Sequence, residues 1–187
     1  MKSPRVSSLS RTLALIPPTV VLIAQQSTAA SDVFLKIGDI KGESVDAEHR
    51  EWIDAWSFQF GVSNPVTLST GGSGAGKASF SDIVITKSLD SASPRLFLGC
   101  AKGTTYPTVT LKLVRAGEIR QTYYQITLSN VTISSVSNSN SEGDDRPSES
   151  VSLFYEKIKI EYWKTDAKGG LTPVAPVEWN VAENTGS

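Results

Sequence analysis

Residues 33–44 read VFLKIGDIKGES and carry the clearest signal for the fold of this chain. Val33 to Ile37 form an apolar run rich in β-branched and aromatic side chains, which favour a strand. Gly38-Asp39 and Lys41-Gly42 follow, and glycine beside a polar residue is typical of turns. The stretch therefore predicts a strand that ends in two successive turns.

Two later blocks combine glycine, charge and a strand pattern in the same way. Gly74-Ala75-Gly76-Lys77 precedes residues 81–87, which read SDIVITK. Residues 142–146 read EGDDR and precede an alternating run that starts at Val151. In this order and at this spacing, the three blocks resemble the haemolysin-coregulated protein (Hcp) family, the tube-forming subunits of bacterial type VI secretion systems. The resemblance extends from Asp32 to Asn180, which is most of the chain.

The resemblance implies a fold, a function and a set of partners. The fold would be mainly β, a compact antiparallel β-barrel with one short side helix. Its subunits would form hexameric rings that stack into a hollow tube, which a contractile sheath fires and which carries secreted effectors in its lumen. The partners would be further copies of this chain and the sheath, spike and effector proteins. The resemblance also implies assembly or fold roles for the matching motif residues, Gly38, Asp39, Gly42, Gly76, Lys77, Asp145 and Arg146.

Composition excludes several other classes of protein. A chain of 187 residues with 39% apolar residues suits one domain with a core, and it is too polar to cross a membrane several times or to insert stably. Beyond residue 30 it has 15 basic and 19 acidic residues, a net charge of −4, without a basic stripe. Such a surface argues against nucleic acid as the main partner.

Cysteine and histidine are too scarce for most catalytic sites. Cys100 is the only cysteine, so an intramolecular disulfide and a thiolate zinc site are excluded. His49 is the only histidine, which removes most catalytic triads and histidine-based metal sites. We therefore predict a protein that is not an enzyme, with no catalytic residue, cofactor or metal. Cys100 itself is expected to be an inert buried thiol, and His49 an exposed loop residue.

Residues 1–30 differ from the rest and divide the chain into a leader and a domain over 31–187. Lys2, Arg5 and Arg11 form a basic start, two short apolar runs form the centre, and residues 27–30 read STAA. This pattern is typical of a cleavable secretory signal peptide, and the alternatives are a disordered extension or a misplaced start codon. Proline at 17 and 18 breaks the apolar centre, which is too short for a spanning helix.

The leader leaves the location and the exact role open. Proteins of the Hcp family normally lack such a signal, because the secretion machine itself carries them out of the cytoplasm. The protein would then be assembled in the cytoplasm and secreted to the extracellular space. A true signal would instead send the subunit to the periplasm, and the alternative function would be a stand-alone, exported Hcp-like binding module.

Alternating apolar and polar residues predict the remaining elements. Strands are expected over 56–60, 80–86, 109–113, 124–128, 131–133, 151–163 and 177–181. In the 151–163 strand the apolar side chains change from odd to even positions, which indicates a β-bulge near Glu156-Lys157. Ser129-Asn130 reads as a turn, and 134–150 as a long surface loop. The only predicted helix begins at Ser93-Pro94, with Ser93 as N-cap, and ends at Gly103.

The glycine-rich segment 67–78 invites a nucleotide-binding interpretation. Residues 71–78 read GGSGAGKA and nearly match the phosphate-binding loop G-x-x-x-x-G-K-[ST]. Ala78, however, replaces the hydroxyl that would hold magnesium, and a strand pattern follows where a helix is needed. We therefore predict a flexible loop, which in the Hcp family lies on the assembling surface.

Acidic residues gather in two further places. Five carboxylates between positions 39 and 51 could perform acid–base chemistry, but no spacing sets two of them across a cleft, so a solvated loop face is the preferred interpretation. Asp144-Asp145-Arg146 lacks the alternate acids and the distal glutamate of a calcium loop, and a local salt bridge or turn is expected there.

Overall fold

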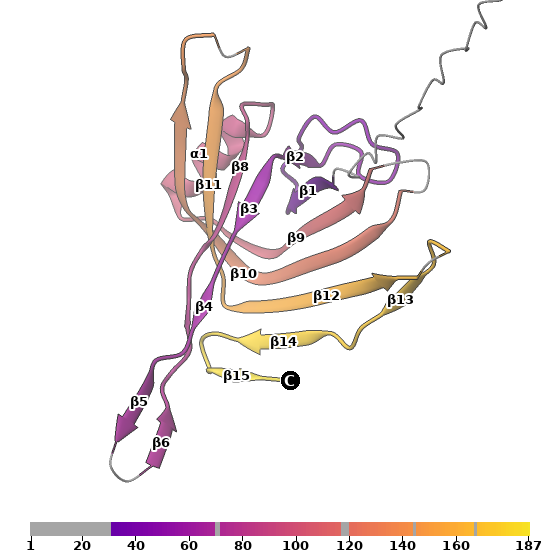
Figure 1. The fold of residues 1–187 in the computed structure, drawn as a ribbon. Helices are drawn as coiled ribbons and strands as arrows, with labels where there is room; N and C mark the ends of the chain where they lie inside the picture. Colours follow the sequence, from indigo (N-terminus) through magenta and orange to yellow (C-terminus); the bar gives the residue numbers. More distant parts are fainter. Residues whose placement is uncertain (1–30, 70–71, 117–119, 144, 167) are drawn as a thin grey trace, which may run out of the picture.

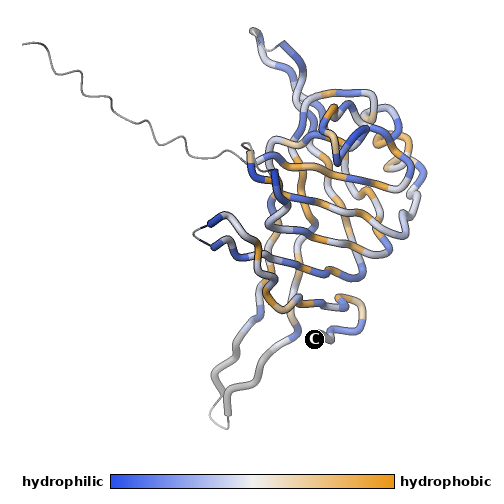
Figure 2. The backbone as a smooth tube through the Cα atoms, turned by 90° about the vertical axis from the view of Figure 1, so that its right-hand side faces the viewer, coloured by the Kyte–Doolittle hydropathy of each residue, from blue (hydrophilic) through white to orange (hydrophobic). Residues whose placement is uncertain are grey.

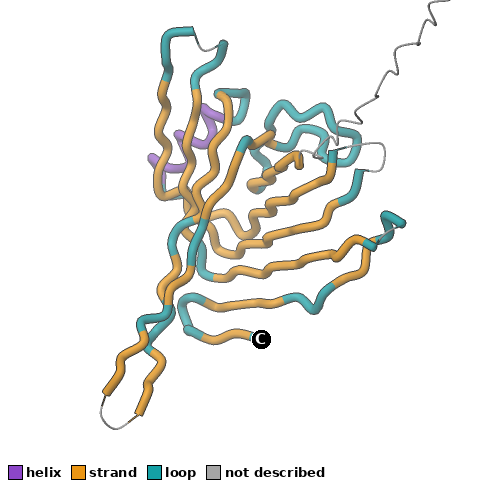
Figure 3. The backbone as a smooth tube through the Cα atoms, in the orientation of Figure 1, coloured by secondary structure: helices purple, strands orange, loops and turns teal. Residues whose placement is uncertain are grey.

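The computed structural model describes residues 31–187 except 70–71, 117–119, 144 and 167, so the leader lies outside the described residues. The described residues form mainly strands, and α1 is the one helix among them (Figures 1 and 3). The first half contains β1 (Ser31–Ile37), β2 (Ile53–Ala55), β3 (Ser57–Gln59), β4 (Val62–Ser63), β5 (Val66–Ser69), β6 (Gly72–Ala75), β7 (Ser79–Phe80), β8 (Ile83–Ser88) and α1 (Ser93–Lys102). The second half contains β9 (Thr105–Arg115), β10 (Thr122–Ser139), β11 (Ser148–Phe154), β12 (Lys157–Thr165), β13 (Leu171–Pro173), β14 (Val177–Asn180) and β15 (Thr185–Gly186).

Eleven strands form one antiparallel sheet that curls around the core. Its main path is β15-β14-β12-β10-β11-β8-β3, and β9, β1 and β2 continue from the other edge of β10. One segment, 53–59, joins the two sides: it begins on β1 as β2 and, beyond Trp56, continues on β8 as β3. The Trp56 amide donates to the Thr86 carbonyl at 2.8 Å. The sheet is thus not closed by an unbroken ladder, but the predicted mainly β class with a side helix is confirmed.

A corner in the sheet replaces the turn that was predicted at Ser129-Asn130. That prediction is wrong, because β10 runs without interruption through Asn130, whose φ is +52°. Beside it the predicted 151–163 strand is divided into β11 and β12, both of which pair with the same edge of β10. Glu156 lies in the break, where its amide donates to the Ser129 carbonyl at 3.1 Å and its carboxylate accepts from the Asn130 side chain at 2.7 Å.

The corner explains the change of apolar phase that the sequence shows. The buried side chains are at odd positions through β11, and Ile158 in β12 is buried at an even one. The chain therefore breaks at the corner instead of bulging within one strand. The predicted loop 134–150 is also shorter than expected, since β10 continues to Ser139 and β11 starts at Ser148.

The predicted flexible loop over residues 67–78 contains a β-hairpin. β5 and β6 pair antiparallel from Val66↔Ala75 to Ser69↔Gly72, and β4 and β7 pair at the base. The hairpin projects away from the curled sheet (Figure 1). Antiparallel pairing between β5 and β6 holds the hairpin together.

The core lies inside the curl and is mostly Ile, Leu and Val. Apolar and polar residues alternate along the long strands (Figure 2), and their inward side chains form one buried cluster, which includes Leu35, Ile53, Ile85, Leu111, Ile126, Ile133 and Leu153. Helix α1 contributes Leu96 to it. Of the aromatic residues at 56, 58 and 60, Phe58 and Phe60 pack against the core, whereas Trp56 is 58% exposed.

Helix α1 begins one residue earlier than predicted. Ala92 is the N-cap and makes no side-chain cap bond, while Ser93 is the first helical residue. Gly103 ends the helix in the left-handed conformation, φ 62°, as predicted. With ten residues, α1 is too short to cross a bilayer, and the described part of the chain holds no other helix.

Candidate functional site

Lys87 is the centre of the most unusual polar cluster in the described structure. On β8 the side chains of Ile83, Ile85 and Lys87 point inward, and Lys87 is 0% exposed. The sequence analysis missed this residue. The signal was present, since Lys87 has the same parity as two core isoleucines on a strand whose period is two.

The Lys87 ammonium group has four oxygen acceptors. Nζ donates to Glu149 Oε2 at 3.0 Å, Asp90 Oδ1 at 2.7 Å, Ser93 Oγ at 3.2 Å and the Ser88 carbonyl at 2.6 Å. Glu149 is the direct cross-strand neighbour of Lys87 in the β8–β11 pairing, and its side chain is also 0% exposed. These bonds offset part of the cost of removing the two charges from water, and the second carboxylate oxygen, Glu149 Oε1, is buried without a hydrogen-bond partner.

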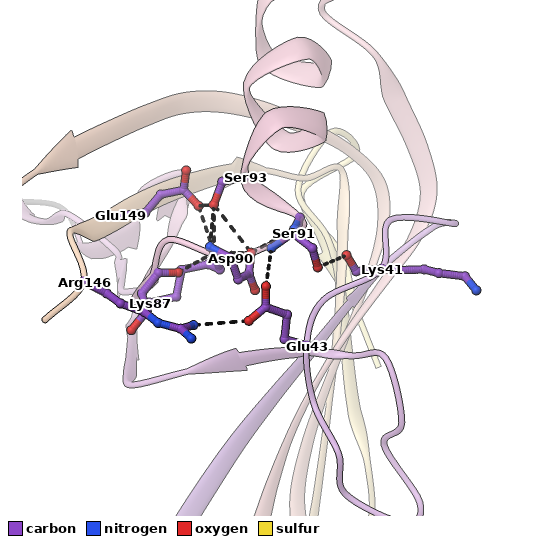
Figure 4. Close-up of polar contacts among 10 residues, drawn as sticks. Lys41, Glu43, Lys87, Asp90, Ser91, Ser93, Arg146 and Glu149 are labelled. Atoms are coloured by element: carbon purple, nitrogen blue, oxygen red, sulfur yellow. Dashed lines mark hydrogen bonds and ion pairs between the residues drawn. The ribbon is translucent and has the colours of Figure 1, made fainter.

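A second layer of contacts lies outside the buried cluster (Figure 4). Glu43 accepts from the Ser91 amide at 3.0 Å and from Arg146 Nη1 at 3.2 Å. Ser91 in turn donates through its hydroxyl to the Lys41 carbonyl at 3.4 Å. The segment after β1, the start of α1 and the β10–β11 loop therefore meet at one end of the sheet. Arg146 pairs with a residue 103 positions away and not locally, whereas the turn that was the predicted alternative is present at Glu142-Gly143.

The first block of the sequence supplies the turns that make this meeting possible. Gly38 has φ +50°, and the Ile40 amide donates to the Ile37 carbonyl at 2.9 Å across it. Gly42 is buried, and a Cβ built there would overlap the Trp52 carbonyl oxygen and lie 2.6 Å from Ile53 Cα. Asp39 is exposed and forms a surface ion pair with Arg95 at 3.3 Å.

Of the remaining motif residues, Asp145 lies at the same end of the sheet, and Gly76 and Lys77 lie elsewhere. Asp145 is exposed in the β10–β11 loop beside Arg146. Gly76 and Lys77 follow β6, where the Gly76 amide donates to the Pro65 carbonyl at 3.1 Å and Lys77 is exposed. The structure thus brings Gly42, Asp145 and Arg146 to one end of the sheet and does not bring Gly76 and Lys77 there. Strands β7 and β8 follow Lys77, where a phosphate-binding loop requires a helix N-terminus.

His49 is buried, so the prediction of an exposed loop residue is wrong. It is 1% exposed and stacks on Phe34 with ring centroids 4.4 Å apart. Its Nδ1 donates to Asp46 Oδ1 at 2.7 Å. Burial opposes ionisation of the Asp46 carboxyl, but the hydrogen bonds from His49 and from two backbone amides outweigh it and lower its pKa. The loop after β1 therefore packs over the outer face of that strand.

The acidic segment is a paired surface and not a catalytic pair. Asp39, Glu43, Asp46 and Glu51 have ion-pair partners in Arg95, Arg146, Arg120 and Lys41 respectively. Cys100 is half-buried against the core, less enclosed than predicted. Within the described ranges, no three His, Cys, Asp or Glu side chains gather as metal ligands would.

Comparison with known proteins identifies the family. The family model described as "Type VI secretion system effector, Hcp" matches residues 34–162. This chain belongs to the Hcp family. It is 39% identical over 160 residues to Protein hcp1 of Pseudomonas aeruginosa PAO1, which covers 83% of this chain and 98% of that protein.

Solved structures agree with the assignment to the Hcp family. A structure described as that of a type six secretion system protein matches with a TM-score of 0.80 and 29% identity, over 84% of this chain and all of the other. Hcp1 from Salmonella typhimurium matches with a TM-score of 0.69 and 29% identity, over 84% and 99% of the two chains. As an Hcp protein, the chain is a self-associating structural subunit of the type VI secretion tube and not an enzyme. Hcp proteins are secreted by that system.

The Glu43–Arg146 pair of this Hcp chain should contribute little to stability. Both side chains are about half exposed, at 47% and 55%, so water and salt screen their attraction. We expect Arg146→Ala to lower the free energy of unfolding by less than about 1 kcal/mol. A double-mutant cycle with Glu43→Ala, measured by urea unfolding, gives the coupling energy. A coupling of several kcal/mol would contradict this and make the pair a main support of the fold.

Proposed function

We propose that this Hcp chain forms hexameric rings, that the rings stack into a hollow tube, and that effectors travel in its lumen. The type VI sheath and spike would be its further partners. The observation that carries the proposal is the match to Hcp proteins over more than four fifths of this chain. The roles of the seven motif residues in assembly or folding are part of the same proposal.

The two ends of the sheet give a physical basis for a ring. β15 ends the main path on one side and β3 on the other, and each leaves a strand edge that a neighbour can cover. A ring needs two different, complementary surfaces on every subunit, and two opposite edges supply them. Between the β4–β7 pair and β12–β14 lies an apolar groove of about 520 Å³, whose lining includes Phe60, Val62, Phe80, Ile158, Val177 and Trp179. A neighbouring copy would remove this apolar surface from water.

Residues 31–187 should assemble without any cofactor. We expect size-exclusion chromatography with light scattering to show a mass about six times that of one chain, because the strand edges and the apolar groove proposed as subunit contacts belong to residues 31–187. The measurement is made over a range of protein concentrations. A strict monomer at high micromolar concentration would contradict the ring.

The β5–β6 hairpin should act between rings and not within them. It projects from the sheet, which suits a contact with the next ring. We expect that replacing residues 67–74 with Asn-Gly, which permits a tight hairpin turn, leaves hexamers intact and abolishes stacked tubes in electron micrographs. Lys77→Ala, at the hairpin base, should weaken stacking and leave ATP binding undetectable, as in the unmodified chain. Tubes of normal length in the shortened variant would contradict the assignment.

The leader favours a second candidate function. We propose that residues 1–30 form a cleavable signal peptide, because their basic start, apolar centre and small residues before Ser31 fit one. A processed chain would act outside the cytoplasm as a stand-alone Hcp-like binding module. An unprocessed chain would be assembled in the cytoplasm and leave through the machine. The route therefore depends on whether the leader is removed.

A further inference from the structure

The end of the sheet beside the apolar groove is covered by a very short strand. β15 has two residues, and it pairs with the outer edge of β14 through Trp179↔Gly186 and Asn180↔Thr185. It is the last strand of the main path, so no further strand of the described chain covers it (Figure 1). We call residues 182–187, which include β15, the strap.

Few contacts hold the strap in place. Thr185, Gly186 and Ser187 are all exposed. Beyond the two strand pairs, Glu178 and Ser187 exchange backbone hydrogen bonds at 2.9 and 3.0 Å, and the Glu183 amide donates to Asn180 Oδ1 at 3.1 Å. Terminal segments with so few buried contacts open locally at a small cost in free energy. The strap can therefore leave β14 while the rest of the sheet stays folded.

Opening the strap uncovers a longer edge and an apolar surface. A Cβ built on Gly186 would overlap the Trp179 ring, so the strap backbone lies directly on the indole. Trp179 in turn packs against Phe80, with ring centroids 5.9 Å apart, and Val177 beside it is 55% exposed. Among the described residues that line the groove, Glu178 is the one charged residue. β14 has four residues that can pair, whereas β15 has two.

We propose that the strap covers a subunit interface in the free chain, and that a strand edge of a second copy displaces it when subunits join. A second copy is the occupant that fits, because Hcp proteins self-associate and the uncovered surface is apolar and nearly free of charge. The inference rests on the proposed ring and names the edge at which its subunits meet.

The incoming strand has the physical advantage over the strap. It can pair with all four residues of β14, and its side chains can cover Val177 and Trp179 in the groove. Each additional backbone bond and each apolar side chain removed from water favours the exchange. The strap competes because it is attached to the same chain and therefore has a high effective concentration.

This competition sets the concentration at which subunits assemble. A neighbour binds only the fraction of subunits whose strap is open, so the apparent affinity between subunits is reduced by that fraction. The free subunit keeps the β14 edge paired, which also protects it from unspecific pairing with other strands. Holding the strap closed should therefore oppose assembly, and removing it should favour assembly.

The test locks the strap with a reversible disulfide in the full chain. Glu178 and Ser187 form a hydrogen-bonded antiparallel pair, and the Cα atoms of such a pair lie about 5.5 Å apart, a distance that a disulfide spans. The variant carries Glu178→Cys and Ser187→Cys, with Cys100→Ala to remove the native thiol. The matched control carries Glu178→Ser and Cys100→Ala and has no cysteine. Intact-mass spectrometry verifies an intramolecular disulfide, and circular dichroism verifies equal strand content.

Size-exclusion chromatography with light scattering follows assembly over a range of protein concentrations, before and after reduction. We expect the reduced variant and the control to form rings in the same range, and the oxidised variant to require at least about a tenfold higher concentration. A chain that ends at Val181 should form rings at a concentration at least about threefold lower than the unmodified chain.

Equal assembly of the oxidised and reduced forms would overturn the strap and leave the ring standing. Monomers in every form, the unmodified chain included, would overturn the ring and the strap with it. If the shortened chain does not fold, the disulfide comparison decides by itself, because its oxidised and reduced forms have the same sequence.

Discussion

Replacing Lys87 with methionine should lower the free energy of unfolding by about 3–5 kcal/mol, the largest loss we expect from a single polar side chain of this protein. The Lys87 and Glu149 side chains are fully buried, 3.0 Å apart, and Asp90 lies on the same ammonium group. The substitution leaves carboxyl groups in the interior without their cation. Urea unfolding at a fixed protein concentration measures the loss, since assembly adds to apparent stability.

The double variant Lys87→Met, Glu149→Leu should regain most of that loss. It removes both members of the cross-strand pair and fills the space with apolar atoms, so Glu149 is no longer buried without a partner. Lys41→Met is the matched control, because Lys41 pairs with Glu51 at the surface, where the side chains are 70% and 55% exposed. Its effect should stay within about 0.5 kcal/mol. If Lys87→Met changed the free energy of unfolding by as little as Lys41→Met, the buried pair would make no net contribution to stability.

Gly42→Ala should destabilise the protein by about 3 kcal/mol or prevent folding. The added methyl would meet backbone, not a flexible side chain: the Trp52 carbonyl oxygen, and Ile53 Cα at 2.6 Å. The Gly42 amide also donates to the Glu51 carbonyl at 2.9 Å, so the segment cannot move away without losing that bond. The change in urea midpoint measures the effect.

Gly61→Ala is the control for the glycine substitution. Its new Cβ would contact only Ser81 Oγ at 3.9 Å, an ordinary van der Waals distance. We expect a change within about 0.5 kcal/mol. Equal stability of the two alanine variants would show that the segment after β1 can shift freely, and Gly42 would then lose its proposed role in the fold.

The family context separates these two residues from the assembly surface. Gly42 and Lys87 act inside one subunit, so their loss should reduce folded protein and tubes together. The hairpin acts between copies, and its shortening should remove tubes alone. Measuring stability and assembly on the same variants therefore distinguishes a fold role from an assembly role for each motif residue.

The sequence by itself determined the elements whose signals are local. The apolar run 33–37 became β1, most of the predicted strand 80–86 lies in β8, and Gly103 ends α1 as predicted. Side-chain period and backbone conformation depend on neighbouring residues, so a short window contains the information. The three blocks also identified the Hcp family, because their order is a property of the chain itself.

Tertiary structure decided which distant residues meet. Lys87 reads as a polar residue at the end of a strand until β11 places Glu149 beside it, 62 positions away. His49 reads as a loop residue until Phe34 and the loop after β1 enclose it. The corner at Asn130 likewise depends on the break opposite it, at Glu156. For Lys87 and for the corner at Asn130, the cost of burying a charge or bending a strand is offset by a partner far along the chain, and no local pattern specifies that partner.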